Sequence, residues 1–73
     1  MTDDAPVLIY GKDSCQYTTR AREAYAAKGR KVVYLNVRED DDALAAMLLK
    51  SAGARRVPVI DDGGTITIGF GGT

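Results

Sequence analysis

The sequence predicts a small α/β domain whose elements follow the order β-α-β-α-β-β around a mixed four-stranded sheet. Two continuous apolar runs, at residues 7–10 and 32–37, are rich in Val, Ile and Tyr, as are strands in the interior of a partly parallel sheet. About one helix separates these runs, and two further apolar runs flank Asp and Gly residues near the end. With 73 residues, the chain forms one domain over residues 1–73.

The first half is expected to be a β-α-β unit. Its helix extends from about Cys15 to Lys28 and contains the Ala-rich run Ala21–Ala27. Gly29 follows immediately, with the basic residues Arg30 and Lys31 behind it. A glycine after the last turn and cations near it are typical of a helix C-terminus.

A second helix is expected after the acidic run Glu39–Asp42, with Leu44, Met47 and Leu48 at helical spacing and Gly53 at its end. The acidic run has two interpretations. It could ligate a metal, but consecutive Asp side chains diverge and no second cluster completes a coordination shell. An Asp N-cap with carboxylates near the positive helix end is the better interpretation, so no metal site is predicted.

The last two strands are expected to form a hairpin. Val57–Ile60 and Thr65–Ile68 flank Asp61–Gly64, which is predicted to be a four-residue loop. The final strand alternates, so its two faces should differ in polarity: Ile66, Ile68 and Phe70 on one face, Thr65, Thr67 and Gly69 on the other.

Composition excludes several classes of function. Ten basic and ten acidic residues cancel, so no basic field attracts nucleic acid or an anionic membrane. The absence of histidine argues against a zinc site or a Cys–His protease pair. No segment is long enough to span a membrane, and the start, Met1–Asp4, is acidic rather than signal-like. One unpaired cysteine fits a reducing, cytoplasmic setting.

Cys15, the only cysteine, is placed between the end of a strand and the start of a helix. The N–H groups of a first helical turn and the helix dipole favour thiolate over thiol, and Lys12 adds a nearby positive charge. Thr18 lies one turn further, where its hydroxyl can donate to the sulfur. Cys15 is therefore a candidate nucleophile, against the alternative of a buried structural cysteine. Arg22, on the same helix, is interpreted as a solvated surface residue.

Three segments together resemble a glutaredoxin of the thioredoxin fold. Tyr10–Thr18 is similar to the glutaredoxin active-site segment, usually Cys-Pro-Tyr-Cys; Arg56-Val57-Pro58 resembles the Thr-Val-Pro loop; and Gly71-Gly72-Thr73 resembles the Gly-Gly pair after the last strand. The run Cys15–Arg22 also resembles a small bacterial group whose members sometimes carry selenocysteine at the position of Cys15.

The sequence departs from the glutaredoxin pattern in three ways. Thr18 stands where the second cysteine would be, so a dithiol resolving step is unavailable. Gln16 replaces the usual proline and restores a backbone N–H near the thiolate. Glutaredoxins usually continue into a helix after the Gly-Gly pair, whereas this sequence ends at Thr73. The expected architecture is therefore a thioredoxin-like fold lacking the usual C-terminal helix.

The resemblance implies a monothiol glutaredoxin-like thiol–disulfide oxidoreductase in which the Cys15 thiolate exchanges with glutathione mixed disulfides. It implies no tightly bound cofactor, glutathione as co-substrate, and glutathionylated or disulfide-containing proteins as partners, together with a weak homodimer. The implied catalytic residues are Cys15, Thr18 and Lys12. The implied substrate-binding residues are Tyr17, Gln16, Arg56, Val57, Pro58, Gly71 and Gly72.

The implied substrate-binding roles follow from the backbone and charge of these segments. The family's matching proline is cis, and the preceding residue offers its backbone to an extended ligand. Arg55 and Arg56 adjoin this loop and could bind a substrate carboxylate. The resemblance also implies that Tyr17 covers glutathione and that the Gly71 and Gly72 N–H groups hold its γ-glutamyl carboxylate.

Three alternative functions remain open at this stage. Cys15 could form a sulfenic acid in a thiol-dependent peroxidase. Two protomers, each with its Cys15, could bridge a two-iron cluster with two glutathiones. The fold could also serve as a redox-inert adaptor that binds peptides beside Val57 and Pro58.

Overall fold

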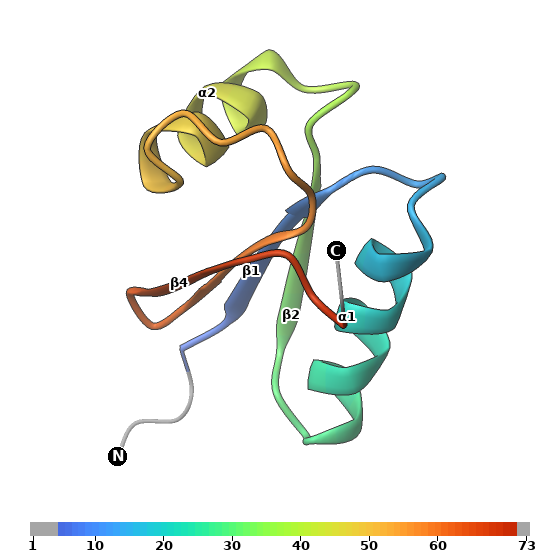
Figure 1. Cartoon of the computed structure of the whole chain (residues 1–73). Helices are drawn as coiled ribbons and strands as arrows, with labels where there is room; N and C mark the ends of the chain where they lie inside the picture. The colour runs from blue at the N-terminus through green and yellow to red at the C-terminus, as the bar shows by residue number, and fades with distance from the viewer. Residues whose placement is uncertain (1–4, 72–73) are drawn as a thin grey trace.

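A computed structural model of the chain describes residues 5–71 (Figure 1). The elements follow the expected order: β1 (Val7–Gly11), α1 (Gln16–Ala27), β2 (Val32–Asn36), α2 (Asp41–Lys50), β3 (Val59–Asp62) and β4 (Thr65–Ile68). The strands form one sheet in the order β2-β1-β3-β4. β1 and β2 are parallel, whereas β3 is antiparallel to both β1 and β4, which confirms the mixed sheet.

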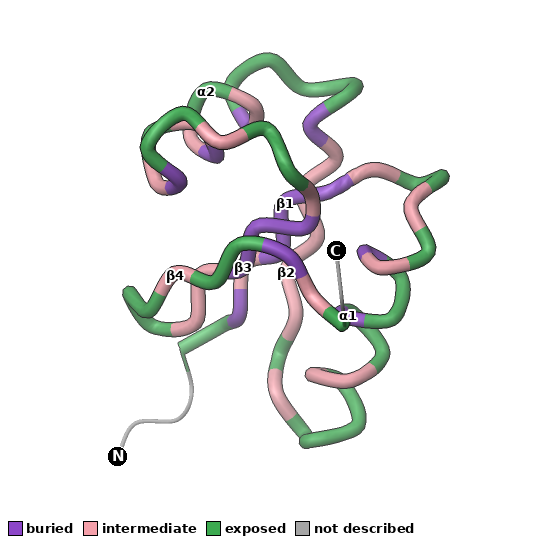
Figure 2. The backbone as a smooth tube through the Cα atoms, viewed as in Figure 1, coloured by how far each residue is buried: buried purple, intermediate pink, exposed green. Residues whose placement is uncertain are grey.

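The two helices cover opposite faces of this sheet (Figure 1). Side chains alternate along β1, because successive residues of a strand point to opposite faces. Val7 and Ile9 form a core with Ala21 of α1, while Tyr10 joins a second core with Met47 of α2. The buried residues therefore gather along the central strands β1 and β3 (Figure 2). β2 is an edge strand and is only half-buried, unlike the fully buried strand that its apolar run suggested.

The helix ends agree with the signals in the sequence. The Asp40 carboxylate caps α2 by accepting hydrogen bonds from the N–H groups of Asp42 (3.0 Å) and Ala43 (3.2 Å). Gly29 and Gly53 follow the two helices with positive φ values of 78° and 90°. Within residues 5–71, no group of three acidic or cysteine side chains is arranged to hold a metal. None of the helices in this range has the length and apolar character needed to cross a membrane.

The hairpin is tighter than expected. Its loop consists of Gly63 and Gly64 alone, and both have positive φ (61° and 97°), as a two-residue hairpin turn requires. β3 extends through Asp61 and Asp62, which pair with β1 on one side and with β4 on the other. Each carboxylate also has a partner outside the hairpin. Lys50 Nζ lies 2.7 Å from Asp61 Oδ2, and Arg30 Nη2 lies 2.7 Å from Asp62 Oδ1.

The last strand keeps the expected alternation only as far as Ile68. Thr65 and Thr67 are exposed, whereas Ile66 packs against the α2 core. Gly69 then turns the chain with a φ of 88°. Phe70 consequently packs against the α1 core instead of sharing the face of Ile66, so its expected placement was wrong.

The register places three loops at one end of the sheet. Gly11 at the end of β1 is opposite Asn36 at the end of β2, and the chain reaches Cys15 just beyond Gly11. Val59 at the start of β3 is opposite Tyr10, so the preceding Val57-Pro58 segment lies at this same end. The Gly63–Gly64 turn lies at the other end.

Candidate active site

Cys15 is the N-cap residue of α1. Its backbone is extended (φ −93°, ψ 115°), and its carbonyl accepts a hydrogen bond from the Thr19 N–H at 3.2 Å. The Cys15 N–H donates to the Lys12 carbonyl at 3.2 Å, which closes the loop between β1 and α1. This backbone places the half-buried Cys15 side chain at the positive end of the helix dipole.

The pKa of Cys15 lies below its ordinary value. Partial burial raises it, but the hydroxyl and N–H of Thr18, the N–H of Tyr17 and the positive charge of Lys12 together outweigh that effect. The sulfur makes no capping hydrogen bond of standard geometry, yet these donors lie close enough to stabilise the thiolate. The two N–H donors belong to Tyr17 and Thr18, the second and third residues of the helix. The N–H of Gln16, the exposed first residue, is not one of them.

Thr18 is completely buried, with a relative exposure of 0%. Its Oγ1 atom forms no hydrogen bond of standard geometry within the described part of the chain. A buried hydroxyl normally has a partner, because leaving it unsatisfied costs free energy. The Thr18 hydroxyl lowers the pKa of Cys15, so it acts as a donor to the Cys15 thiolate.

The Val57–Pro58 peptide bond is cis, as the resemblance implied. Pro58 is buried, and its carbonyl accepts a hydrogen bond from the Gly69 N–H at 2.7 Å, which ties this loop to the end of β4. Val57 remains half-buried and faces a groove.

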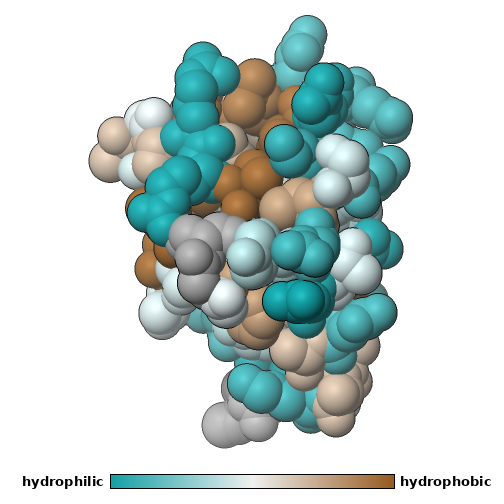
Figure 3. Space-filling view, turned by 45° about the vertical axis from the view of Figure 1, so that its right-hand side comes forward, coloured by the Kyte–Doolittle hydropathy of each residue, from teal (hydrophilic) through white to brown (hydrophobic). Residues whose placement is uncertain are grey.

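That groove, called here the α2 groove, has a volume of about 390 Å³. It combines apolar side chains with three cations and one carboxylate: Val37, Leu44, Met47 and Val57 with Lys12, Arg38, Arg55 and Asp41. Apolar atoms are visible between hydrophilic side chains in the upper part of the molecule, where α2 lies (Figure 3). Lys12 both lines the groove and lowers the Cys15 pKa, so one end of the groove is near the thiol.

Tyr17 does not line the α2 groove and lies beside the chain that follows β4. A β-carbon built on Gly71 would lie 3.9 Å from Tyr17 Cδ1, so the two residues are neighbours. Gly71 has a positive φ of 64°, which suits glycine. The guanidinium of Arg20 lies 5.6 Å from the centre of the Tyr17 ring. Gly72, which was expected to act with Gly71, lies outside the described residues.

The sequence matches the glutaredoxin family over residues 7–66. The chain belongs to the glutaredoxin family. No curated protein matches the sequence significantly. Among solved structures, a glutaredoxin from Archaeoglobus fulgidus superposes with a TM-score of 0.73 at 21% identity, over 92% of this chain and 77% of that one. This likeness confirms the fold.

Two structures of buckwheat glutaredoxin are also similar. A mutated form has a TM-score of 0.72 at 25% identity, and a complex with glutathione has a TM-score of 0.72 at 26% identity. Each comparison covers 92% of this glutaredoxin but 63% of the buckwheat chain, so the present chain spans less than two thirds of those relatives.

Two residues of the α2 groove were not predicted from the sequence. Arg38 and Asp41 line it, and neither was expected there. The available signal was the position of Arg38 just after a strand parallel to the one that precedes Cys15, since the carboxyl ends of parallel strands meet at one edge. Of the two arginines near Pro58, Arg55 lines the groove, whereas Arg56 is exposed and is not among the lining residues.

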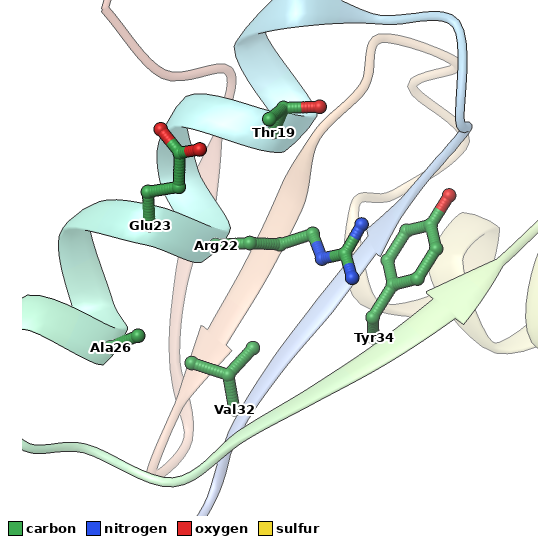
Figure 4. A pocket seen from close by; sticks show the side chains of 6 residues that line it. All are labelled: Thr19, Arg22, Glu23, Ala26, Val32 and Tyr34. Carbon is green, nitrogen blue, oxygen red and sulfur yellow. The ribbon is translucent and has the colours of Figure 1, made fainter.

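A second groove, the α1–β2 groove, has a volume of about 380 Å³ and is lined by Thr19, Arg22, Glu23, Ala26, Val32 and Tyr34 (Figure 4). The Arg22 guanidinium lies 4.0 Å from the centre of the Tyr34 ring, and the Tyr34 hydroxyl donates to Asp13 at 2.7 Å. Burial and this bond to Asp13 raise the pKa of Tyr34 to about 12. These contacts join the loop before Cys15 to β2, and Arg22 is exposed but not wholly solvated.

Proposed function

We propose that this glutaredoxin is a monothiol, glutathione-dependent thiol–disulfide oxidoreductase with Cys15 as its nucleophile. The observation that carries the proposal is the position of Cys15 at the start of α1, where several donors lower its pKa. A thiolate, not a thiol, attacks a disulfide sulfur, so this environment increases the reactive fraction near neutral pH.

The proposed reaction has two exchanges. The Cys15 thiolate attacks the glutathione sulfur of a protein–glutathione disulfide; a Cys15–glutathione disulfide forms and the protein leaves as a thiolate. A second glutathione thiolate then attacks the glutathione sulfur of that intermediate. This step releases oxidised glutathione and restores the Cys15 thiolate. Thr18 carries no sulfur, so the second glutathione supplies the electrons that a second cysteine would otherwise provide.

Glutathione would be bound on both sides of Cys15. Its glycine carboxylate suits the cationic wall of the α2 groove, where Lys12, Arg38 and Arg55 are available, while Arg56 could bind the exposed end of a larger substrate. The backbone of Val57 before the cis Pro58 would hold the cysteinyl part of glutathione. On the other side, Tyr17 and the Gly71–Gly72 backbone would hold its γ-glutamyl end, with the Gln16 side chain at the rim.

The buckwheat glutaredoxin crystallised with glutathione supports this choice of ligand. The run Cys15–Arg22 also resembles glutaredoxin-like proteins that sometimes carry selenocysteine at the position of Cys15. A selenol has a lower intrinsic pKa than a thiol. At the start of α1 it would face the same donors and perform the same exchange.

The test measures glutathione release from the cysteine–glutathione mixed disulfide, with reduced glutathione as the second substrate. We expect Cys15→Ser to abolish the catalysed rate completely. Activity that persists in Cys15→Ser, or wild-type protein no faster than free glutathione, would refute the proposal. Intact mass spectrometry of the protein with oxidised glutathione should show one added glutathione in the wild type and none in Cys15→Ser.

The groove is tested by charge removal. Arg38→Ala should raise KM for the mixed disulfide several-fold with little change in kcat, because the carboxylate contact is made equally in the ground state and the transition state. Lys31→Ala is the matched control, since Lys31 is exposed and its carbonyl bonds to Val7 at the opposite end of β1. Equal effects of the two substitutions on KM would show that general charge, not the groove, governs binding.

A further inference from the structure

Gly11 ends β1 and lies directly against the first turn of α1. It is buried, and its carbonyl accepts a hydrogen bond from the Val37 N–H at 2.9 Å. Within residues 5–71, Gly11 is the one glycine without a positive φ. Its backbone would therefore accept alanine, and alanine is generally more favourable than glycine inside a strand. Backbone conformation does not explain why glycine is found here.

The neighbouring side chain does explain it. A β-carbon built on Gly11 would collide with both Oγ1 and Cγ2 of Thr18 and would lie 3.0 Å from Thr18 Cβ. Thr18 is completely buried, so it cannot swing into solvent. Two of its three staggered γ positions face Gly11 and both are filled, so any rotation about χ1 leaves at least one heavy atom there.

We propose that Gly11 is a positioning residue for the Cys15 site: the absence of a side chain at position 11 admits a β-branched threonine at position 18, with its hydroxyl held beside the sulfur. The pair is matched in size, since threonine fills the volume that glycine leaves open. Any larger residue at position 11 displaces Thr18 and removes the donor from the thiolate.

The proposal rests on the proposed function only in taking the Cys15 thiolate as the reacting group. Its test is a double-mutant cycle of wild type, Gly11→Ala, Thr18→Ala and the double variant. Two quantities are measured without glutathione: the pH dependence of Cys15 alkylation by iodoacetamide, and the temperature of thermal unfolding. Wild-type protein that shows the cycle but no glutathione exchange would refute the proposed function and leave this inference standing.

In the wild-type background, Gly11→Ala should slow alkylation near neutral pH by roughly three- to tenfold, an upward shift of the midpoint by about half to one pH unit. Overpacking should also lower the unfolding temperature by roughly 5–20 °C. In the Thr18→Ala background, Gly11→Ala should leave the alkylation midpoint unchanged and lower the unfolding temperature by clearly less than in the wild-type background, because the colliding γ atoms and the hydroxyl are absent and only the 3.0 Å approach to the β-carbon of residue 18 remains.

Equal shifts of the alkylation midpoint in both backgrounds would overturn the proposal, as would no shift in either. Leu48→Ala, in the α2 core on the other face of the sheet, controls for general loss of stability. It should lower the unfolding temperature and leave the midpoint unchanged. If Gly11→Ala alone does not fold, the double variant decides. Folding of the double variant, with an unfolding temperature within a few degrees of that of Thr18→Ala, supports the size match, and failure to fold refutes it.

Discussion

Thr18 contributes both to the packing of this glutaredoxin and to the chemistry of its thiol. Its methyl group and hydroxyl fill the space above Gly11, while the hydroxyl and N–H both act on the Cys15 sulfur. A threonine at this position thus supplies a donor to the thiolate but no second sulfur that could form a disulfide with Cys15. The cost is a buried hydroxyl that forms no hydrogen bond of standard geometry within the described residues.

Removing only the hydroxyl should separate these two effects. Thr18→Val keeps the shape, so the side chain still fits above Gly11, but it cannot donate to the sulfur. We expect the midpoint of Cys15 alkylation to move to higher pH, because a donor that lowers the pKa has been removed. Alkylation near neutral pH should become slower.

The free energy of unfolding of Thr18→Val should be unchanged or higher at neutral pH, because a poorly satisfied buried hydroxyl is replaced by a methyl group. Chemical denaturation and the pH profile of alkylation are the measurements. A Thr18→Val protein with an unchanged alkylation midpoint would show that the N–H groups alone stabilise the thiolate. Thr19→Val, one exposed residue further along, is the matched control, since the Thr19 hydroxyl donates to the Cys15 carbonyl at 3.5 Å rather than to the sulfur.

At the scale of elements, the two helices begin in chemically different ways. Asp40 caps α2 with two hydrogen bonds, whereas Cys15 occupies the same position in α1 without a capping bond of standard geometry. The first N–H groups of α1 consequently remain available to stabilise an anion. One helix start is built for stability and the other for reactivity.

Asp40→Ala should therefore lower the free energy of unfolding by about 1 kcal/mol, the usual cost of losing an N-cap, as measured by urea denaturation. Glu39→Ala removes an exposed carboxylate one residue earlier and should change the stability by less than about 0.5 kcal/mol. Equal losses in the two variants would mean that charge near the helix, not the cap, matters. Cys15 alkylation should be unaffected in both, because its donors belong to α1.

Over the whole molecule, two ion pairs join elements that are distant in sequence. Lys50 of α2 contacts Asp61 of β3 at 2.7 Å and also donates to the Tyr10 hydroxyl at 2.8 Å. Arg30, between α1 and β2, binds Asp62 and reaches the Ala5 carbonyl at 3.3 Å. The first pair therefore links α2 to the sheet, and the second links the connection between α1 and β2 to β3.

The ion pairs give the stability a dependence on acid pH. The Lys50 ammonium lowers the pKa of Asp61, and the Arg30 guanidinium lowers that of Asp62. The unfolded chain therefore binds protons first, and stability falls as the pH drops below the ordinary aspartate pKa of about 3.9 and through the lower values of the folded state. Above that range the contribution is fully present.

Lys50→Met should flatten this dependence, because the pKa of Asp61 in the folded state loses its largest lowering influence. The measurement is the unfolding temperature as a function of pH from neutrality into the acid range. Lys31→Met removes an exposed charge of the same kind and should leave the acid slope as in the wild type. An identical slope in Lys50→Met and wild type would contradict the assignment.

The fold could be predicted largely because its signals are local. Gly29, Asp40 and the apolar runs each act within a few residues of where they stand, and the structure confirms them. The position of Arg38 in the α2 groove could not be predicted from local signals. It depends on the register that places Asn36 opposite Gly11, a contact between residues far apart in the chain.

The hairpin loop shows the same limit. The composition of the four residues Asp61–Gly64 predicts a loop, yet Asp61 and Asp62 belong to β3 because they pair with β1, a strand far away in the sequence. Phe70 changes face because Gly69 turns the chain, and alternation alone does not reveal such a turn. At Cys15, sequence indicated the thiol, Lys12 and Thr18 correctly as neighbours, but not the steric fit between Thr18 and Gly11.

The Gly63–Gly64 turn has a practical consequence for work on this protein. It is exposed, it joins two strands by the shortest type of connection, and the register places it at the end of the sheet remote from Cys15. Exposed turns of small residues are the sites where proteins best accept inserted sequence. A fluorescent tag or an immobilisation peptide placed between the two glycines would therefore give the molecule a handle that leaves its thiol accessible.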